Sequence, residues 1–157
     1  MSNRFNRHSP LLYVDMPSTE SLKQIYGTFS RAMLTKHKQV KHFASQLTDA
    51  MVLFYRENQQ RFTVDTQPHY LYSPRELTRW KVAIHEAIFN RNDLDPTFLV
   101  QLFIHEGSRI FSDRLVDNED KIWSENRIGE IVDTNFKCQS KLIPRPILFS
   151  SQLEQYY

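Results

Sequence analysis

The 157-residue chain contains little glycine, one cysteine and no long apolar run. Three glycines favour helices over folds that need many tight turns. The single cysteine, Cys138, excludes an internal disulfide and is typical of a reducing compartment such as the cytosol. No segment approaches the ~20 apolar residues of a membrane span, and the polar, basic residues 1–10 predict no signal peptide.

Neither sign of charge dominates the sequence. Twenty Lys and Arg residues nearly balance eighteen Asp and Glu residues, so the composition does not indicate a nucleic-acid-binding protein. A hydrophobic fraction of 40% and an aromatic fraction of 13% are those of a globular chain. At this length we expect one domain, or a piece of one, with a buried core.

Apolar residues recur at helical spacing along most of the chain. With the start signals at Ser18, Ser73 and Asp95, the pattern predicts helices over residues 18–34, 38–62, 74–90, 96–116 and 119–136. The first of these is expected to bury one face, formed by Leu22, Ile25, Tyr26, Phe29 and Met33.

Two segments do not follow the helical pattern. Residues 11–14, Leu-Leu-Tyr-Val, predict a buried strand, but no partner strand lies nearby, which suggests that the chain was cut from something larger. Residues 141–150 contain two prolines and predict an extended tail. The expected fold is mainly α: a bundle of four or five helices, preceded by an orphan strand and followed by the tail.

Residues 67–80, QPHYLYSPRELTRW, contain a complete helix start. Ser73 is placed as the N-cap, and Pro74 occupies the first helical position, where its missing N–H costs nothing. Glu76, three residues after Ser73, completes a capping box. Tyr72 and Leu77 have the spacing of a hydrophobic staple. We therefore expect a firmly defined helix start at this point.

Arg75 is unusual at this helix start. A cation in the first turn opposes the helix dipole by about 0.3–1 kcal/mol. One interpretation is that Arg75 pairs with Glu76 or another nearby acid. The other is that its guanidinium, together with free N–H groups and the positive end of the dipole, binds a phosphate. The residues themselves favour the first interpretation.

The remaining candidate groups predict no catalytic or metal site within the chain. The phosphate-loop pattern GxxxxGK(S/T) does not occur. The pairs His85-Glu86 and His105-Glu106 lack a second histidine at zinc-ligand spacing, so structural histidines are expected. Cys138 has no neighbouring His or Cys and reads as an ordinary thiol.

Residues 4–8, Arg-Phe-Asn-Arg-His, form a basic cluster before the predicted strand. Such a cluster is usually a solvated surface. Its alternative use is that of an arginine finger, which reaches across an interface to a neighbour's phosphate.

Several ordered motifs resemble cytoplasmic dynein heavy chains, and they occur in the order found in the third AAA+ module of the motor ring. They cover nearly the whole chain: residues 3–15 (NRFNRHSPLLYVD), 24–33 (QIYGTFSRAM), 67–80, 105–106 (HE), 109–116 (RIFSDRLV) and 145–150 (RPILFS). Residues 36–42 and 90–95 differ from animal-type sequences in a way that suggests a fungal relative.

The resemblance implies a division into three parts. Residues 1–35 would be the last strand and helix of the AAA+ large subdomain. Residues 36–140 would be the helical lid, and residues 141–157 an extended linker toward the fourth module. The phosphate loop and the magnesium-binding acids would lie upstream, outside this chain.

The resemblance also assigns site residues. Arg75 matches the sensor-two position, whose arginine reaches the terminal phosphates of ATP, and Pro74 would lie near the adenine or ribose. Arg4, or less favourably Arg7, matches the arginine finger that serves the second module. ATP or ADP with Mg would belong to the parent module, and none is expected to bind the chain alone tightly.

The parent implied by the resemblance is an ATP-driven, minus-end-directed microtubule motor of the cytoplasm and cytoskeleton. Its third module is regulatory. The expected partners are the rest of the motor ring, microtubules and accessory chains, with no nucleic acid and no membrane. The chain alone is expected neither to hydrolyse ATP nor to bind microtubules.

Two other functions are compatible with a helical bundle. A free-standing protein–protein interaction module predicts a surface with no large apolar face, whereas the fragment interpretation predicts that Leu11 and Leu12 are exposed or covered by another copy. A helix-turn-helix nucleic-acid binder would need basic residues concentrated on one helix. Instead, Arg75, Arg79 and Lys81 are interspersed with acids.

Overall fold

Helices account for all the regular structure in the part of the chain that the computed structural model describes, which is Arg7, residues 11–137 and Ile147. The α-helices are α2 (Thr19–Leu34), α3 (Ala44–Arg61), α4 (Pro74–Phe89), α5 (Pro96–Phe111) and α6 (Asn118–Phe136), and a short 3-10 helix, η1, spans Lys41–Phe43. The predicted mainly α fold is confirmed, and no described helix is long and apolar enough to cross a membrane.

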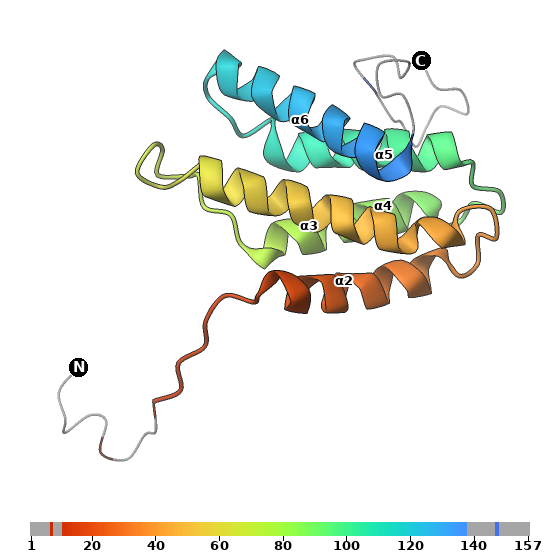
Figure 1. Cartoon of the computed structure of the whole chain (residues 1–157), viewed down its shortest axis with the longest axis horizontal. Helices are drawn as coiled ribbons and strands as arrows, with labels where there is room; N and C mark the ends of the chain where they lie inside the picture. Colours follow the sequence, from red (N-terminus) through yellow and green to blue (C-terminus); the bar gives the residue numbers. More distant parts are fainter. Residues whose placement is uncertain (1–6, 8–10, 138–146, 148–157) are drawn as a thin grey trace.

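The helices pack in two layers (Figure 1). α3 lies between α2 and α6 in one layer, and α4 and α5 lie side by side in the other. α4 also contacts α2 and α3, and α5 contacts α6, which closes the bundle around one core. α4 is thus packed against three helices, and its start is held relative to all of them.

Aromatic rings fill the centre of the core. Trp80 of α4 lies with its ring centroid 4.6 Å from that of Phe103, 5.9 Å from Phe54 and 5.5 Å from Phe111. Its indole Nε1 donates a hydrogen bond of 3.2 Å to the Phe103 carbonyl. The buried polar edge of Trp80 is therefore satisfied, and the residue joins α4 to α3 and α5.

Two helix starts are capped as the sequence predicts. Ser18 accepts a 3.2 Å hydrogen bond from the backbone N–H of Ser21 at the start of α2. Asp95 accepts one of 2.8 Å from the N–H of Thr97, with Pro96 at the first position of α5. Each cap pairs one backbone donor that the helix itself leaves unpaired.

Two helices are shorter than predicted. α3 begins at Ala44, not near residue 38, because residues 35–43 fold as turns and η1. Val40 lies in these turns and is fully buried, so its apolar side chain fits the helical pattern of the sequence although it is not in a helix. α5 ends at Phe111, not near residue 116, because the N–H groups of Ser112 and Asp113 both donate to the Ser108 carbonyl.

The predicted buried face of α2 is wrong at two positions. Ile25 is 46% exposed and Phe29 is 58% exposed. The buried stripe is rotated toward the small residues Gly27 and Ser30, where the Ser30 hydroxyl hydrogen-bonds Thr48 of α3 at 2.7 Å. Small side chains let α2 approach α3 closely, and this turns the larger apolar residues outward.

The predicted orphan strand is not formed. Residues 11–14 carry no secondary structure and lead away from the bundle in Figure 1, with side chains between 72% and 88% exposed. A strand without a partner leaves its backbone groups unpaired, so nothing holds these residues in a sheet. Their exposure agrees with the expectation for Leu11 and Leu12 in a fragment.

The division of the chain at residues 35 and 140 stays a prediction. α2, which that division assigns to the large subdomain, packs against α3 and α4 within the same bundle. Cys138 and all of the tail except Ile147 lie outside the described residues. The Ile147 carbonyl lies 2.7 Å from His105 Nδ1.

Candidate functional site

The start of α4 has the predicted capping box. The backbone N–H of Ser73 donates to Glu76 Oε2 at 2.8 Å, and the Ser73 hydroxyl donates to the same oxygen at 3.0 Å. The N–H of Arg75 donates to Ser73 Oγ at 3.4 Å, and Pro74 occupies the first position. Tyr72 and Leu77 are both buried, as a hydrophobic staple requires.

The loop after α5 holds this helix start from one side, through contacts that sequence reasoning missed. Arg114 Nη1 lies 3.6 Å from Glu76 Oε1, and the guanidinium lies 5.0 Å from the centroid of the Tyr72 ring. The N–H of Val116 donates to the Tyr70 hydroxyl at 2.9 Å. Burial raises the pKa of Tyr72 to about 12, so its phenol stays protonated.

α2 holds the helix start from the other side. The Tyr26 hydroxyl donates to the Pro74 carbonyl at 2.7 Å and lies 2.9 Å from the Thr78 hydroxyl. Because Tyr26 is buried, its ring is fixed in the core while its hydroxyl holds the first turn of α4. The start of α4 is therefore held by two separate segments, the loop after α5 and α2, in addition to its own capping box.

The side chain of Arg75 is exposed to solvent at this capped helix start. Glu76, its first expected partner, already accepts hydrogen bonds from Ser73 and faces Arg114. Among the described residues, no ion pair or side-chain hydrogen bond involves the Arg75 guanidinium. Within that part of the chain, the interpretation of Arg75 as a partner of Glu76 is wrong.

The backbone of the first turn offers little to an anion. Pro74 has no N–H, the N–H of Arg75 is directed at Ser73 Oγ, and the N–H of Glu76 donates to the Ser73 carbonyl at 3.1 Å. The capping box thus occupies donors that the sequence suggested would be free. Any phosphate at this helix end would be held chiefly by the guanidinium of Arg75.

A polar pocket of about 390 Å³ lies between α4 and α5. Its charged lining residues are three glutamates and three arginines: Glu76, Arg79, Glu86, Glu106, Arg109 and Arg114. Glu106 Oε2 lies 3.5 Å from Arg109 Nη1, three residues further along α5, which is a favourable spacing for an ion pair on a helix. Because the three positive and three negative charges balance, and Arg109 and Arg114 already face Glu106 and Glu76, this pocket does not select an anion.

The other predicted candidates are spread over the molecule. Arg7 is exposed, whereas Arg4 lies outside the described residues. His85 lines a different pocket, between α2 and α4. The described residues contain no group of three or more His, Cys, Asp or Glu side chains placed to hold a metal ion.

The sequence of this chain matches a family of known proteins. Residues 29–121, more than half of the chain, match the family profile described as dynein heavy chain, ATPase lid domain. The chain belongs to the dynein heavy chain family. The matched segment begins in α2 and ends in α6, so the dynein lid region includes the capped start of α4 and all of its supports but Tyr26.

Individual dynein heavy chains match over the full length of this chain. The cytoplasmic dynein heavy chain of Paramecium tetraurelia is 49% identical over 158 residues, and dynein heavy chain-like protein 1 of Plasmodium falciparum is 51% identical over 158 residues. In both cases the match covers 100% of this chain and 3% of the relative.

The cytoplasmic dynein heavy chain of Neurospora crassa is 45% identical over 159 residues, which are 100% of this chain and 4% of that protein. This identity is lower than the identities to the two protist dyneins. It gives no support to the expectation of a fungal relative. The chain therefore spans only a few per cent of the length of the dyneins that it matches.

Ser73→Ala is expected to lower the free energy of unfolding by about 0.5–2 kcal/mol, because the lost hydroxyl caps α4 and hydrogen-bonds Glu76. Urea denaturation of the 157-residue chain measures the change. Thr97→Ala, in the first turn of α5, is the control because it leaves the backbone N–H that Asp95 caps. An unchanged unfolding midpoint for Ser73→Ala would show that the cap adds nothing.

Proposed function

We propose that this chain is a segment of a cytoplasmic dynein heavy chain, the lid of the third AAA+ module, and that Arg75 is its sensor-two residue. The observation that carries the proposal is an exposed arginine on a rigidly mounted helix start, whose nearest acid is already engaged. A buried or paired arginine could not reach a ligand held by another subdomain.

In this proposal the guanidinium of Arg75 binds the terminal phosphate of the nucleotide, so the contact depends on whether that phosphate is present. ATP or ADP with Mg would be bound by the large subdomain of the same module, and Pro74 would lie near the adenine or ribose. A guanidinium binds phosphate oxygens through strong, directional hydrogen bonds. Loss of the terminal phosphate removes the anion that favours one lid position, and the equilibrium between lid positions shifts.

The exposed residues 11–14 support an origin in a larger protein. Four consecutive apolar side chains, each at least 72% exposed, would be unfavourable on a free-standing interaction module. In the proposed parent they would form the last strand of the large subdomain, and residues 141–157 would lead to the fourth module. Arg4, or else Arg7, would be the arginine finger for the second module.

The proposed parent is an ATPase motor that moves toward microtubule minus ends in the cytoplasm. The third module would regulate microtubule release by the main ATPase site, and the lid would transmit its nucleotide state to the ring. The partners of this chain would be the large subdomain of its own module and the second and fourth modules. Microtubules and accessory chains would bind the parent elsewhere.

Arg75→Ala in a full motor is expected to weaken the response to nucleotide at the third module by about tenfold or more, because a hydrogen-bonded charge typically contributes about 1.5–3 kcal/mol. Microtubule release measured against ATP concentration, with the main ATPase site intact, reports this response. Arg79→Ala is the matched control: this arginine is exposed one turn further along α4 and lines the charge-balanced pocket.

The same two variants of the 157-residue chain should melt within a few degrees of the original. That result would exclude unfolding as the cause of a lost response. An unchanged nucleotide response in the Arg75→Ala motor would contradict the phosphate role. ATP turnover or microtubule co-sedimentation by the purified 157-residue chain would contradict its assignment as a lid without catalytic parts.

A further inference from the structure

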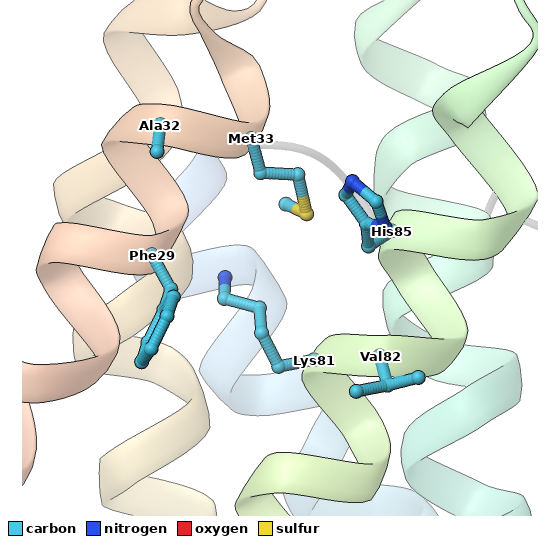
Figure 2. A pocket seen from close by; sticks show the side chains of 6 residues that line it. All are labelled: Phe29, Ala32, Met33, Lys81, Val82 and His85. Carbon is cyan, nitrogen blue, oxygen red and sulfur yellow. The ribbon is translucent and has the colours of Figure 1, made fainter.

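A second pocket, of about 370 Å³, lies between α2 and α4. Its lining is mostly apolar: Phe29, Ala32 and Met33 from α2, and Lys81, Val82 and His85 from α4. Figure 2 shows Lys81 reaching from α4 toward α2, with its amino group between Phe29 on one side and Met33 and His85 on the other. This pocket lies more than a turn beyond Arg75 along α4 and has no part in the proposed phosphate contact.

The amino group of Lys81 is buried among neutral partners. The residue is 6% exposed, and Nζ donates a hydrogen bond to Ser30 Oγ. The Ser30 hydroxyl is in turn bonded to the Tyr26 carbonyl at 2.9 Å and to Thr48 Oγ1 at 2.7 Å. Within the described part of the chain, no carboxylate pairs with this amine, and apart from Lys81 only His85 is titratable among the lining residues.

Burial without a counter-charge disfavours the ammonium form. It lowers the pKa of Lys81 from its usual value to about 7, with no contribution from charged groups on α2, α3 or α4. A large fraction of this amine is therefore neutral at physiological pH, whereas an exposed lysine is almost entirely protonated. A neutral amine in an apolar pocket has the properties of a lysine nucleophile.

We propose that Lys81 is a reactive amine that forms a Schiff base with an apolar aldehyde bound between α2 and α4. The Nζ lone pair attacks the carbonyl carbon, and the carbonyl oxygen takes a proton from nitrogen to give a carbinolamine. This intermediate loses one water as the carbon–nitrogen double bond forms. The step requires no oxidant or reductant, and neither reactants nor imine need a buried charge.

The pocket also determines the class of aldehyde. Its volume holds an aromatic ring or a short alkyl chain against Phe29, Met33 and Val82. An aldehyde such as glyoxylate, whose carboxylate adjoins the carbonyl, would have to bring that charge into the apolar lining and lose its hydration. We therefore expect benzaldehyde to be preferred over glyoxylate at Lys81 but not at an exposed lysine.

The test is reductive trapping on the folded 157-residue chain. Limiting benzaldehyde is added at pH 7, the imine is reduced with borohydride, and the labelled lysines are located by peptide mass analysis. Lys81 should be labelled at least tenfold more than the exposed Lys38. The ratio of Lys81 to Lys38 labelling should fall as the pH is raised toward 10, because Lys38 then also becomes neutral.

Two further experiments distinguish the contribution of the pocket to labelling from that of the amine itself. Ala32→Leu adds bulk at the exposed edge of the pocket and keeps the amine, so it should reduce labelling of Lys81 and leave Lys38 unchanged. In 8 M urea, where the chain is unfolded, the preference for Lys81 should disappear. Both results are expected whether or not Arg75 contacts nucleotide.

Three outcomes would overturn the proposal. Labelling of Lys81 within twofold of Lys38 at pH 7 would show that the amine is not activated. Equal preference for glyoxylate and benzaldehyde would show that the apolar lining does not select the aldehyde. If Lys81 is labelled as strongly in a folded Ala32→Leu variant as in the original chain, the aldehyde does not enter the pocket.

Discussion

Lys81→Met is expected to stabilise the chain at pH 6 and to have little effect at pH 10. The pKa of this amine is about 7 in the folded chain, whereas an unfolded chain gives a lysine its usual, higher value. Between these two values the unfolded state binds more protons, so the free energy of unfolding of the original chain rises with pH. Below about pH 7 both states are protonated, and the cost of burying the ammonium is complete.

The gain at pH 6 should be about 2–4 kcal/mol, since each unit of pKa difference corresponds to about 1.4 kcal/mol and local relaxation reduces the total. Methionine has a similar length and fills irregular apolar space, so it should leave no large cavity. Ser30 would keep its hydrogen bonds to Tyr26 and Thr48, so the substitution leaves no buried hydroxyl without a hydrogen bond.

Urea denaturation of both proteins at pH 6, 8 and 10 measures this effect. The difference in the free energy of unfolding should shrink steadily as the pH rises. Lys38→Met, at an exposed position, should change stability by less than about 0.5 kcal/mol at each pH. A gain of equal size at pH 6 and pH 10 would mean that Lys81 is buried without an electrostatic cost.

Gly107→Ala is expected to destabilise the chain by about 1–3 kcal/mol, the usual range for overpacking a core. An added Cβ would lie 2.6 Å from Trp80 Cζ2 and 2.7 Å from Ile128 Cδ1, closer than such atoms can pack. Trp80 cannot easily move, because its indole is hydrogen-bonded to Phe103 and it is fully buried. The clash therefore outweighs the gain of about 1 kcal/mol that alanine brings to a helix interior.

Gly27→Ala is the matched control for this substitution. It makes the same change in the middle of α2, but the nearest atom to the new Cβ is Arg31 Nη1 at 3.5 Å, at the end of a flexible side chain. This variant should be neutral or more stable by up to about 1 kcal/mol. Thermal and urea unfolding of both variants give the comparison. A Gly107→Ala chain as stable as the original would show that the packing around Trp80 can yield.

The helices and their starts could be predicted because their signals are local. Ser18, Ser73 and Asp95 each act on backbone groups within three residues, so short sequence patterns contain both partners. The predictions are wrong where contacts with distant segments decide which side chains are buried. Val40 is buried by turns and not by a helix, and Phe29 is exposed because small residues on α2 form the contact with α3.

The candidate site shows the same limit. The sequence identifies Arg75 as an unusual residue at a well-capped helix start, but it cannot show whether an acid neutralises it. That depends on Arg114, which lies far along the chain and reaches Glu76 only in the folded bundle. In the sequence Lys81 is one of three basic residues interspersed with acids, and only the packing of α2 on α4 reveals that its amine is buried.

For this protein, the sequence alone determined the helical class, the capped start of α4 and the resemblance to dynein heavy chains, because these depend on neighbouring residues and on ordered motifs. Only the tertiary structure decided which charges are engaged and which are available. The energy of a charged group depends on its solvent and partners, and both are supplied by segments distant in sequence. Arg75 is exposed with its neighbour Glu76 engaged by Arg114, whereas Lys81 is enclosed without a counter-charge.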